Sequence, residues 1–237
     1  MIFNKTMILI LLSLITTTCF GQTTVDSVFI SDVRYRNDEF SNHHAGSGFL
    51  VKYKGKTYAC TAKHVLSFAK TDEMKTVSFG DDLASWTLAS KNNPDVKIAA
   101  GKLINENPEE SIVMPPLGDW LIFEVKGTVP KNVAVYKLSK KDLKKGDPVT
   151  ILGYPYKSEG AIRVVGSYAG LTEDQKGYTV EAPEGNYAGT SGGPILDQNG
   201  KLIGLVSMGF FDEEKNKMIL EPAPLDYFLQ VMKNLRK

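Results

Sequence analysis

The stretch GNYAGTSGGPILDQNGKLIGLVSMG, residues 185–209, surrounds one serine with an unusual number of glycines. Glycine lets the backbone turn its N–H groups toward one point and leaves room for a ligand against the main chain. A serine hydroxyl becomes a good nucleophile when a base takes its proton and nearby donors stabilise an oxyanion. The stretch therefore predicts Ser191 as a nucleophile, with the N–H groups of Gly189 and Ser191 as an oxyanion hole. A glycine-rich turn with an incidental serine is the structural alternative.

Short alternating or apolar runs, rich in Val, Ile, Tyr and Thr and bounded by Gly, Pro, Asn and Asp, recur along the whole chain. These runs are residues 25–35, 47–62, 75–79, 119–125, 133–138, 147–156, 161–171, 177–182 and 194–208. Two of them read as hairpins, over residues 51–58 and over residues 195–206 with its turn at Asn199-Gly200. Strands at this spacing with no helices between them predict an all-β sandwich or barrels.

One amphipathic helix is expected at the C-terminal end, over residues 224–236. Leu225, Phe228, Leu229 and Met232 fall at helical spacing on one face. The lysine-rich stretch 126–147 reads as the connection between two β halves, with a strand inside it.

The N-terminus has the pattern of a secretory signal peptide, expected over residues 1–21. Lys5 precedes an apolar run that is too short to cross a bilayer. The protein is therefore expected to be exported, to a periplasm or to the medium, with no integral membrane segment after signal removal. Lipid anchoring at Cys19 is the alternative, although Thr16 to Thr18 match the usual pattern before a lipidated cysteine poorly.

Composition narrows the function further. The formal net charge is +1 with no long basic run, which argues against nucleic acid as a partner. Signal removal would leave Cys60 as the one cysteine, in apolar surroundings that favour a buried free thiol. No His, Cys and Asp cluster has metal-ligand spacing and no phosphate-binding loop is present, so no metal and no cofactor is expected.

The base that a serine nucleophile needs is expected to be a histidine, because its pKa lies near neutral pH. The chain has three. His64 follows a β-rich run and so stands at a strand end, where a barrel can hold it rigidly. His43 and His44 lie in a polar loop beside glycines and read as solvent-exposed loop residues.

A carboxylate must then fix the imidazole tautomer. Asp119 opens an apolar strand that can bury the pair, whereas Asp81, Asp82 and Asp95 lie in polar stretches and read as solvated. An aspartate before a strand is also a common turn residue. The chain order His64, Asp119, Ser191 is that of the chymotrypsin arrangement and differs from subtilisin and the α/β-hydrolases.

With these motifs the chain resembles the trypsin/chymotrypsin superfamily of serine proteases, and most of all its bacterial, disulfide-free members of the Deg (high-temperature-requirement) type. The resemblance spans about residues 28–236. The stretches that carry it are GSGFLV at 46–51, TAKHVL at 61–66, DWLIFEV at 119–125, ILGYP at 151–155 and GTSGGPILDQNGKLIGLVS at 189–207.

The resemblance implies one protease domain over residues 22–237, made of two packed six-stranded antiparallel β-barrels closed by the C-terminal helix. The first barrel would cover about residues 22–130 and the second about residues 131–223. Thr190 stands where the digestive enzymes have an aspartate that pairs with a new N-terminus, so activation by N-terminal cleavage is not expected. A peptide-binding PDZ module, usual in Deg proteins, is not expected either.

The resemblance also implies a set of substrate-binding positions. Ser207, Met208 and Gly209 match the strand that pairs with an extended substrate backbone. Gly185 matches the key position of the primary specificity pocket and suits a small to medium apolar side chain. Glu221 is an alternative determinant that would favour a basic one. Tyr187 and Ala188 would line the cleft entrance; a packing role for Tyr187 and for Met208 fits as well.

The expected function is that of an exported serine endopeptidase acting on polypeptides through His64, Asp119 and Ser191 and an acyl-enzyme. An esterase with the same triad, and a catalytically idle fold that binds extended peptides, are the alternatives. The sequence says nothing of the oligomeric state.

Overall fold

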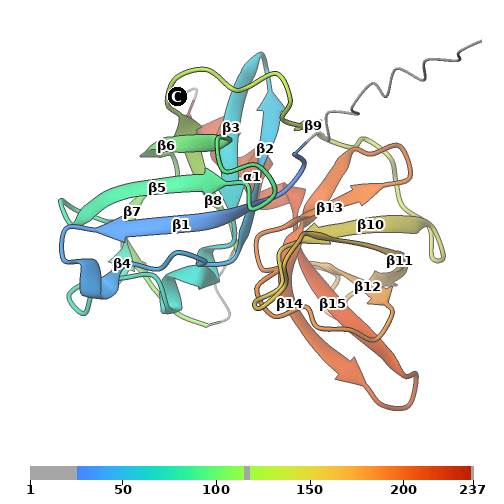
Figure 1. Ribbon diagram of the computed structural model, residues 1–237. Helices are drawn as coiled ribbons and strands as arrows, with labels where there is room; N and C mark the ends of the chain where they lie inside the picture. Colours follow the sequence, from blue (N-terminus) through green and yellow to red (C-terminus); the bar gives the residue numbers. More distant parts are fainter. Residues whose placement is uncertain (1–25, 115–117, 236–237) are drawn as a thin grey trace, which may run out of the picture.

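The computed structural model describes residues 26–114 and 118–235, which form two β-barrels side by side (Figure 1). The expected signal segment and Cys19 lie outside the described residues.

The first barrel is a ring of antiparallel strands in the order β1-β5-β6-β8-β3-β2, closed by the pairing of β1 with β2. Its strands are β1 (Phe29–Tyr35), β2 (Ser47–Tyr53), β3 (Lys56–Thr61), β5 (Leu83–Ala89), β6 (Lys97–Leu103) and β8 (Leu121–Val125). A short two-stranded sheet of β4 (Thr76–Val77) and β7 (Asn107–Ser111) is separate from the ring. The connection between the barrels contains β9 (Val135–Lys137), which adds to β2 in parallel.

The second barrel is closed in the order β10-β11-β12-β15-β14-β13, with every pairing antiparallel. Its strands are β10 (Pro148–Gly153), β11 (Ile162–Leu171), β12 (Tyr178–Ala182), β13 (Pro194–Asp197), β14 (Leu202–Asp212) and β15 (Lys217–Pro224). Both expected hairpins are confirmed. Tyr53 pairs with Lys56 at the end of the β2–β3 hairpin, and β13 pairs with β14 across the turn that contains Gly200.

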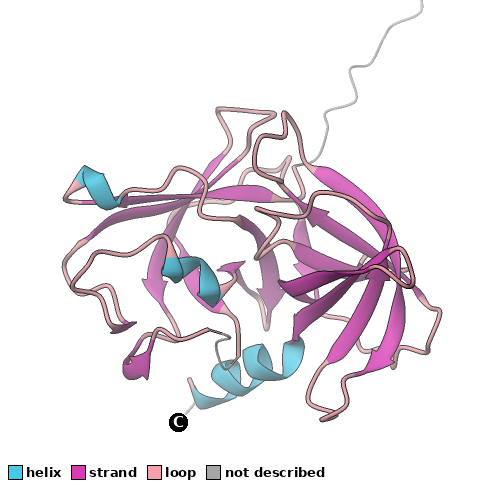
Figure 2. Ribbon diagram, turned by 90° about the horizontal axis from the view of Figure 1, so that it is seen from below, coloured by secondary structure: helices cyan, strands magenta, loops and turns pink. Residues whose placement is uncertain are grey.

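The expected C-terminal helix is confirmed as α1 (Leu225–Asn234), which lies at the foot of the barrels in Figure 2. Its apolar face is narrower than predicted: Phe228 and Met232 are buried, but Leu229 is exposed. The face packs on the first barrel, because the Phe228 ring contacts those of Tyr53 and Trp120. Two short 3-10 helices, η1 (Asp38–Phe40) and η2 (Lys63–Ser67), complete the described elements.

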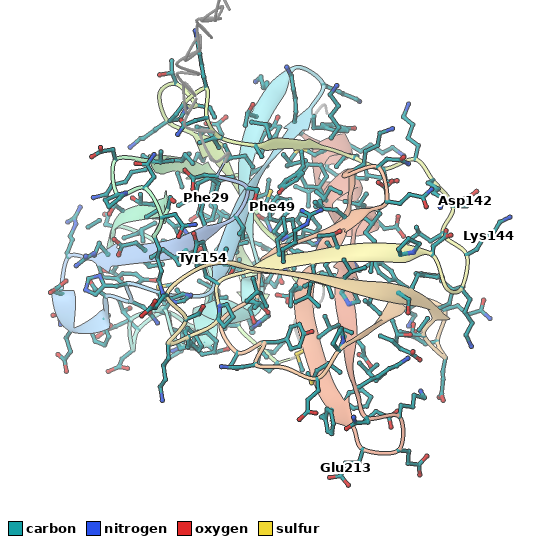
Figure 3. The ribbon with its side chains drawn as sticks, turned by 45° about the vertical axis from the view of Figure 1, so that its right-hand side comes forward. Phe29, Phe49, Asp142, Lys144, Tyr154 and Glu213 are labelled. Carbon is teal, nitrogen blue, oxygen red and sulfur yellow. The ribbon has the colours of Figure 1, made fainter. Side chains whose placement is uncertain are left out.

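Two clusters of buried apolar side chains form the core. The smaller one fills the second barrel. The larger one fills the first barrel and continues across the junction, where Leu152 and Tyr154 of the second barrel join it. Figure 3 labels Tyr154, Phe29 and Phe49, which all belong to this larger cluster. This shared core packs the two barrels against each other.

The all-β class and the two six-stranded barrels with a C-terminal helix are therefore confirmed. Three strands, β5, β6 and β7, lie in stretches for which the sequence pattern predicted none.

Candidate active site

His64 lies in η2, directly after β3, and only 6% of its surface is exposed. The strand ends where the Thr61 hydroxyl donates to the carbonyl oxygen of Ser47 on the neighbouring strand, at 2.6 Å. Val65 and Leu66, the next residues, are fully buried and anchor the turn in the core. The expected position of His64 at a strand end is thus what the structure shows, with one 3-10 turn added.

Asp119 holds this histidine through two contacts. Its Oδ2 lies 2.7 Å from His64 Nδ1, and its Oδ1 accepts the backbone N–H of His64 at 2.8 Å. Oδ2 also accepts the hydroxyl of Ser207 on β14. One buried carboxylate therefore fixes the backbone and the ring of His64 together and links the two barrels.

The electrostatics of Asp119 follow from the same contacts. Burial by itself would raise the pKa of this carboxyl, but the hydrogen bonds from His64 and Ser207 and the charge of His64 outweigh it, so the pKa lies below its usual value. The group is therefore ionised near neutral pH and can hold the Nδ1–H tautomer of the imidazole, which leaves Nε2 as an acceptor.

Ser191 lies in the loop between β12 and β13, partly exposed. Its carbonyl oxygen accepts the N–H of Ser47 at 2.7 Å. A Cβ on Gly46 would lie 2.7 Å from that same oxygen and 3.0 Å from the side chain of Val65, so the serine and the residue after His64 both adjoin Gly46. Within the described residues, the Ser191 hydroxyl makes no hydrogen bond to His64 or to any other group.

The glycines of the serine loop are required by close approach and by backbone conformation. Gly192 has φ of 83°, and a Cβ there would overlap the Ser47 carbonyl and the Thr61 hydroxyl. Gly189 has φ of 98°, and a Cβ there would lie 2.6 Å from the backbone nitrogen of Tyr156. The loop is thus pressed against both barrels at once.

Three successive carbonyl groups of this loop are held in place. Ala188 O accepts the N–H of Tyr156 at 2.7 Å, and Thr190 O accepts that of Gly193 at 2.8 Å. Gly189 O accepts the Ser47 hydroxyl at 2.9 Å. In a trans peptide the N–H points opposite to the preceding C=O. The N–H groups of Gly189 and Ser191 are therefore directed away from these partners.

The expected substrate-binding residues lie in this loop and on β14. Gly185, Ala188, Met208 and Gly209 are exposed, and the Tyr187 ring adjoins the Gly185 backbone while its hydroxyl donates to Pro183 O at 2.9 Å. Tyr187 thus combines packing with a position at the surface.

Ser207 differs from the other expected substrate-binding residues, since its hydroxyl is engaged with Asp119. The sequence could not show this contact, because the two residues are far apart in the chain. Met208 pairs with Glu221 across β14 and β15, and both line a hollow of about 250 Å³ that also borders Asp119 and Ser207. Glu221 is exposed there.

The other two histidines differ from each other. His43 is exposed, as expected, and lies 3.1 Å from Asp32. His44 is not the solvent-exposed residue that the loop predicted: its Nε2 lies 3.0 Å from Tyr154 O and its ring packs edge-on against Tyr156. Partial burial, with a smaller effect of Lys91, lowers its pKa. Asp81, Asp82 and Asp95 are exposed, as predicted.

Cys60 is the free, buried cysteine that was expected, and burial raises the pKa of its thiol well above the usual value. Among residues 26–114 and 118–235, no group of three or more His, Cys, Asp or Glu side chains could hold a metal ion. No helix in the same part of the chain is long and apolar enough to cross a membrane.

The fold consists of two joined β-barrels, with a buried histidine–aspartate pair and a serine in a glycine-rich loop. These features define the class of chymotrypsin-like serine proteases. The chain belongs to the family of the trypsin-like peptidase domain, whose model matches residues 46–205. No curated protein matches the sequence.

Among solved structures, the fold is similar to that of the serine endoprotease from Yersinia pestis. The TM-score is 0.57 at 20% sequence identity, covering 90% of this chain and 64% of that one. The chain thus spans just under two thirds of that protein's length.

Proposed function

We propose that the protein is an exported serine endopeptidase in which Ser191 is the nucleophile, His64 the general base and Asp119 the group that orients His64. The observation that carries the proposal is the double contact of Asp119 with His64. It fixes the ring with Nδ1 toward the carboxylate, so that Nε2 faces away from it and can take a proton. The Ser191 loop adjoins the same turn of the chain.

The proposed reaction has two halves. Ser191 Oγ bonds to the peptide carbonyl carbon while its proton passes to His64 Nε2. The C–N bond then breaks as that proton passes to the leaving amine, which leaves an acyl-enzyme. Water adds to the acyl carbon, gives its proton to His64 and releases Ser191 with the proton returned. Asp119 stays ionised throughout and stabilises the imidazolium in each half.

The oxyanion would be held by the N–H groups of Gly189 and Ser191. Support comes from the fixed carbonyls of Ala188 and Thr190, whose peptide planes set the direction of these two N–H groups. Donors that are already oriented cost no reorganisation when charge develops on the substrate oxygen.

An extended polypeptide is the proposed substrate, because β14 offers a free edge beside the serine. The backbone of Val206 is hydrogen-bonded to Gly192 and Gly193 in the loop that carries Ser191. At Met208 and Gly209 the strand pairs with β15 on one side, and from Ser207 to Gly209 no described strand pairs with it on the other. A substrate backbone could add there as a further strand. Gly185 carries no charge that could pair with a basic side chain, so a small to medium apolar side chain before the scissile bond is proposed.

Export rests on the N-terminal signal pattern, which is a sequence argument alone. Secretion with cleavage near residue 21 would be read from the N-terminus of the protein recovered outside the cytoplasm. Recovery of uncleaved protein from the cytoplasm would contradict it.

Labelling by a fluorophosphonate probe tests the proposed chemistry, with Ser191→Ala as the matched control. Labelling of the wild type alone is expected, followed by turnover of peptide substrates. Turnover of esters without peptides would indicate an esterase, and peptide binding without labelling would indicate an idle binding module.

A further inference from the structure

Next to His64 and Asp119 lies a group of residues that the proposed reaction does not use. We name it the Tyr227 cluster: Lys63, Asn105, Glu110, Gly118 and Tyr227. Lys63 immediately precedes His64 and Gly118 immediately precedes Asp119. Tyr227 belongs to the first turn of α1, more than a hundred residues later in the chain.

Lys63 is the buried cation of the cluster, with 3% of its side chain exposed. Its Nζ lies 2.5 Å from Glu110 of β7 and 3.3 Å from the Tyr227 hydroxyl, and 4.7 Å from the centroid of the Tyr227 ring. A buried ammonium is tolerated when such partners replace its water. These contacts tie the turn that carries His64 to α1 and to an outer strand.

Tyr227 also contacts the segment that carries Asp119. Its ring packs on Gly118 so closely that a Cβ at this position, which has φ of 57°, would overlap it. Asn105 donates to the carbonyl of Trp120 at 2.7 Å, and the same amide group lies 3.3 Å from the Tyr227 hydroxyl. The Trp120 indole N–H donates in turn to Pro224 O, directly before α1, at 3.0 Å.

One side chain of the C-terminal helix thus touches the residue before His64 and the residue before Asp119. We propose that Tyr227 and Lys63 are positioning residues that set the geometry of the His64–Asp119 pair, so that α1 acts as a brace for the active site. This inference rests on the proposed function, since it assigns the cluster an effect on the reactivity of Ser191. Small displacements of such a pair have large effects on rate, because proton transfer needs close and aligned groups.

The test compares variants that remove cluster contacts with one that loosens α1 elsewhere. Tyr227→Phe removes the hydroxyl but keeps the ring on Gly118, and Lys63→Met removes the cation. Tyr53→Leu is the matched control, because the Tyr53 ring contacts Phe228 of the same helix but makes no hydrogen bond, ion pair or ring contact with the residues of the cluster. If Lys63→Met does not fold because the Glu110 carboxylate has lost its cationic partner, the double variant with Glu110→Gln removes both charges.

Three quantities are measured at a temperature at which each variant is fully folded: the free energy of unfolding in urea, the rate constant of labelling by a small fluorophosphonate, and the low-field proton resonance of His64 Nδ1–H. We expect labelling about 10- to 100-fold slower for the cluster variants, with a shifted or broadened resonance. Tyr53→Leu should lose stability but keep its labelling rate within about twofold, as a change in helix docking alone predicts.

Two results would show that the positioning role is wrong. In the first, the folded cluster variants have the labelling rate and the Nδ1–H resonance of the wild type; in the second, Tyr53→Leu slows labelling as much as the cluster variants do. Failure of the proposed function looks different. In that case the wild type itself does not label, while the resonance of the His64–Asp119 pair still shows whether the cluster sets its geometry.

Discussion

Replacing Ser207 by alanine removes one hydroxyl that donates to the buried carboxylate of Asp119. The change leaves no large cavity, because it deletes a single oxygen atom from a half-buried side chain. A hydrogen bond to a charged group contributes about 1.5–3 kcal/mol to stability. Asp119 is 4% exposed, so loss of the hydroxyl leaves a buried carboxylate with one hydrogen-bond donor fewer. We therefore expect the free energy of unfolding to fall by about 1.5–3 kcal/mol, which for a chain of this length lowers the Tm by about 3–12 °C.

The two contacts of Asp119 with His64 remain in this variant, so the labelling rate of Ser191 should fall far less than on loss of the carboxylate itself. Urea unfolding and fluorophosphonate labelling measure the two effects separately. Ser139→Ala is a matched control, since the Ser139 hydroxyl donates to the buried Asp197 at 2.6 Å in the second barrel. It should cost a similar stability with no change in labelling. A Ser207→Ala protein as stable as the wild type, to within about 0.5 kcal/mol, would refute the reasoning.

Further predictions concern three residues: Asp119 through its hydrogen bonds, Gly192 through its backbone geometry and Cys60 through its burial. Asp119→Asn should slow labelling by about 10⁴-fold. Folding lowers the pKa of Asp119, so this residue contributes its full stabilisation above its unfolded pKa of about 3.9 and loses it as the pH falls through the folded value. Below about pH 4, acid should therefore lower the free energy of unfolding of Asp119→Asn less than that of the wild type. In urea unfolding, Gly192→Ala should lower the free energy of unfolding several times more than the roughly 1–2 kcal/mol expected for Gly200→Ala. Both glycines have positive φ, but of the two only Gly192 has neighbouring atoms that a Cβ would overlap. Equal losses of stability would contradict the close packing at Gly192. Cys60 should resist alkylation at pH 8 until the protein unfolds, because burial raises its pKa; rapid modification of the native protein would show that it is accessible.

Local patterns in the sequence were enough to predict the all-β class, the two hairpins and the C-terminal helix, whereas the two-barrel arrangement was expected from the resemblance to the trypsin/chymotrypsin superfamily. Alternation of apolar residues with a period of two reports directly on a strand with one buried face. Positive φ and close approach leave glycine as the residue that fits, so the loop around Ser191 is marked in the sequence itself.

Strands β5, β6 and β7 show where such patterns fail. The sequence of β6, KIAAGKL, is rich in residues with low strand propensity, yet it is a strand because β5 and β8 on either side complete its hydrogen bonds. The charged segment NPEES of β7 is exposed apart from Glu110, and it pairs with β4. Pairing with strands outside each segment decides these elements.

The same holds within the site. The residue types and order of His64, Asp119 and Ser191 were readable in the sequence, but the contact of Ser207 with Asp119 and that of Lys63 with Tyr227 were not. These contacts join segments that meet only when both barrels and the C-terminal helix are packed. Chemistry that depends on residue type is written locally in the chain. The geometry that supports it is set by tertiary packing, because it depends on distances between segments that no local pattern encodes.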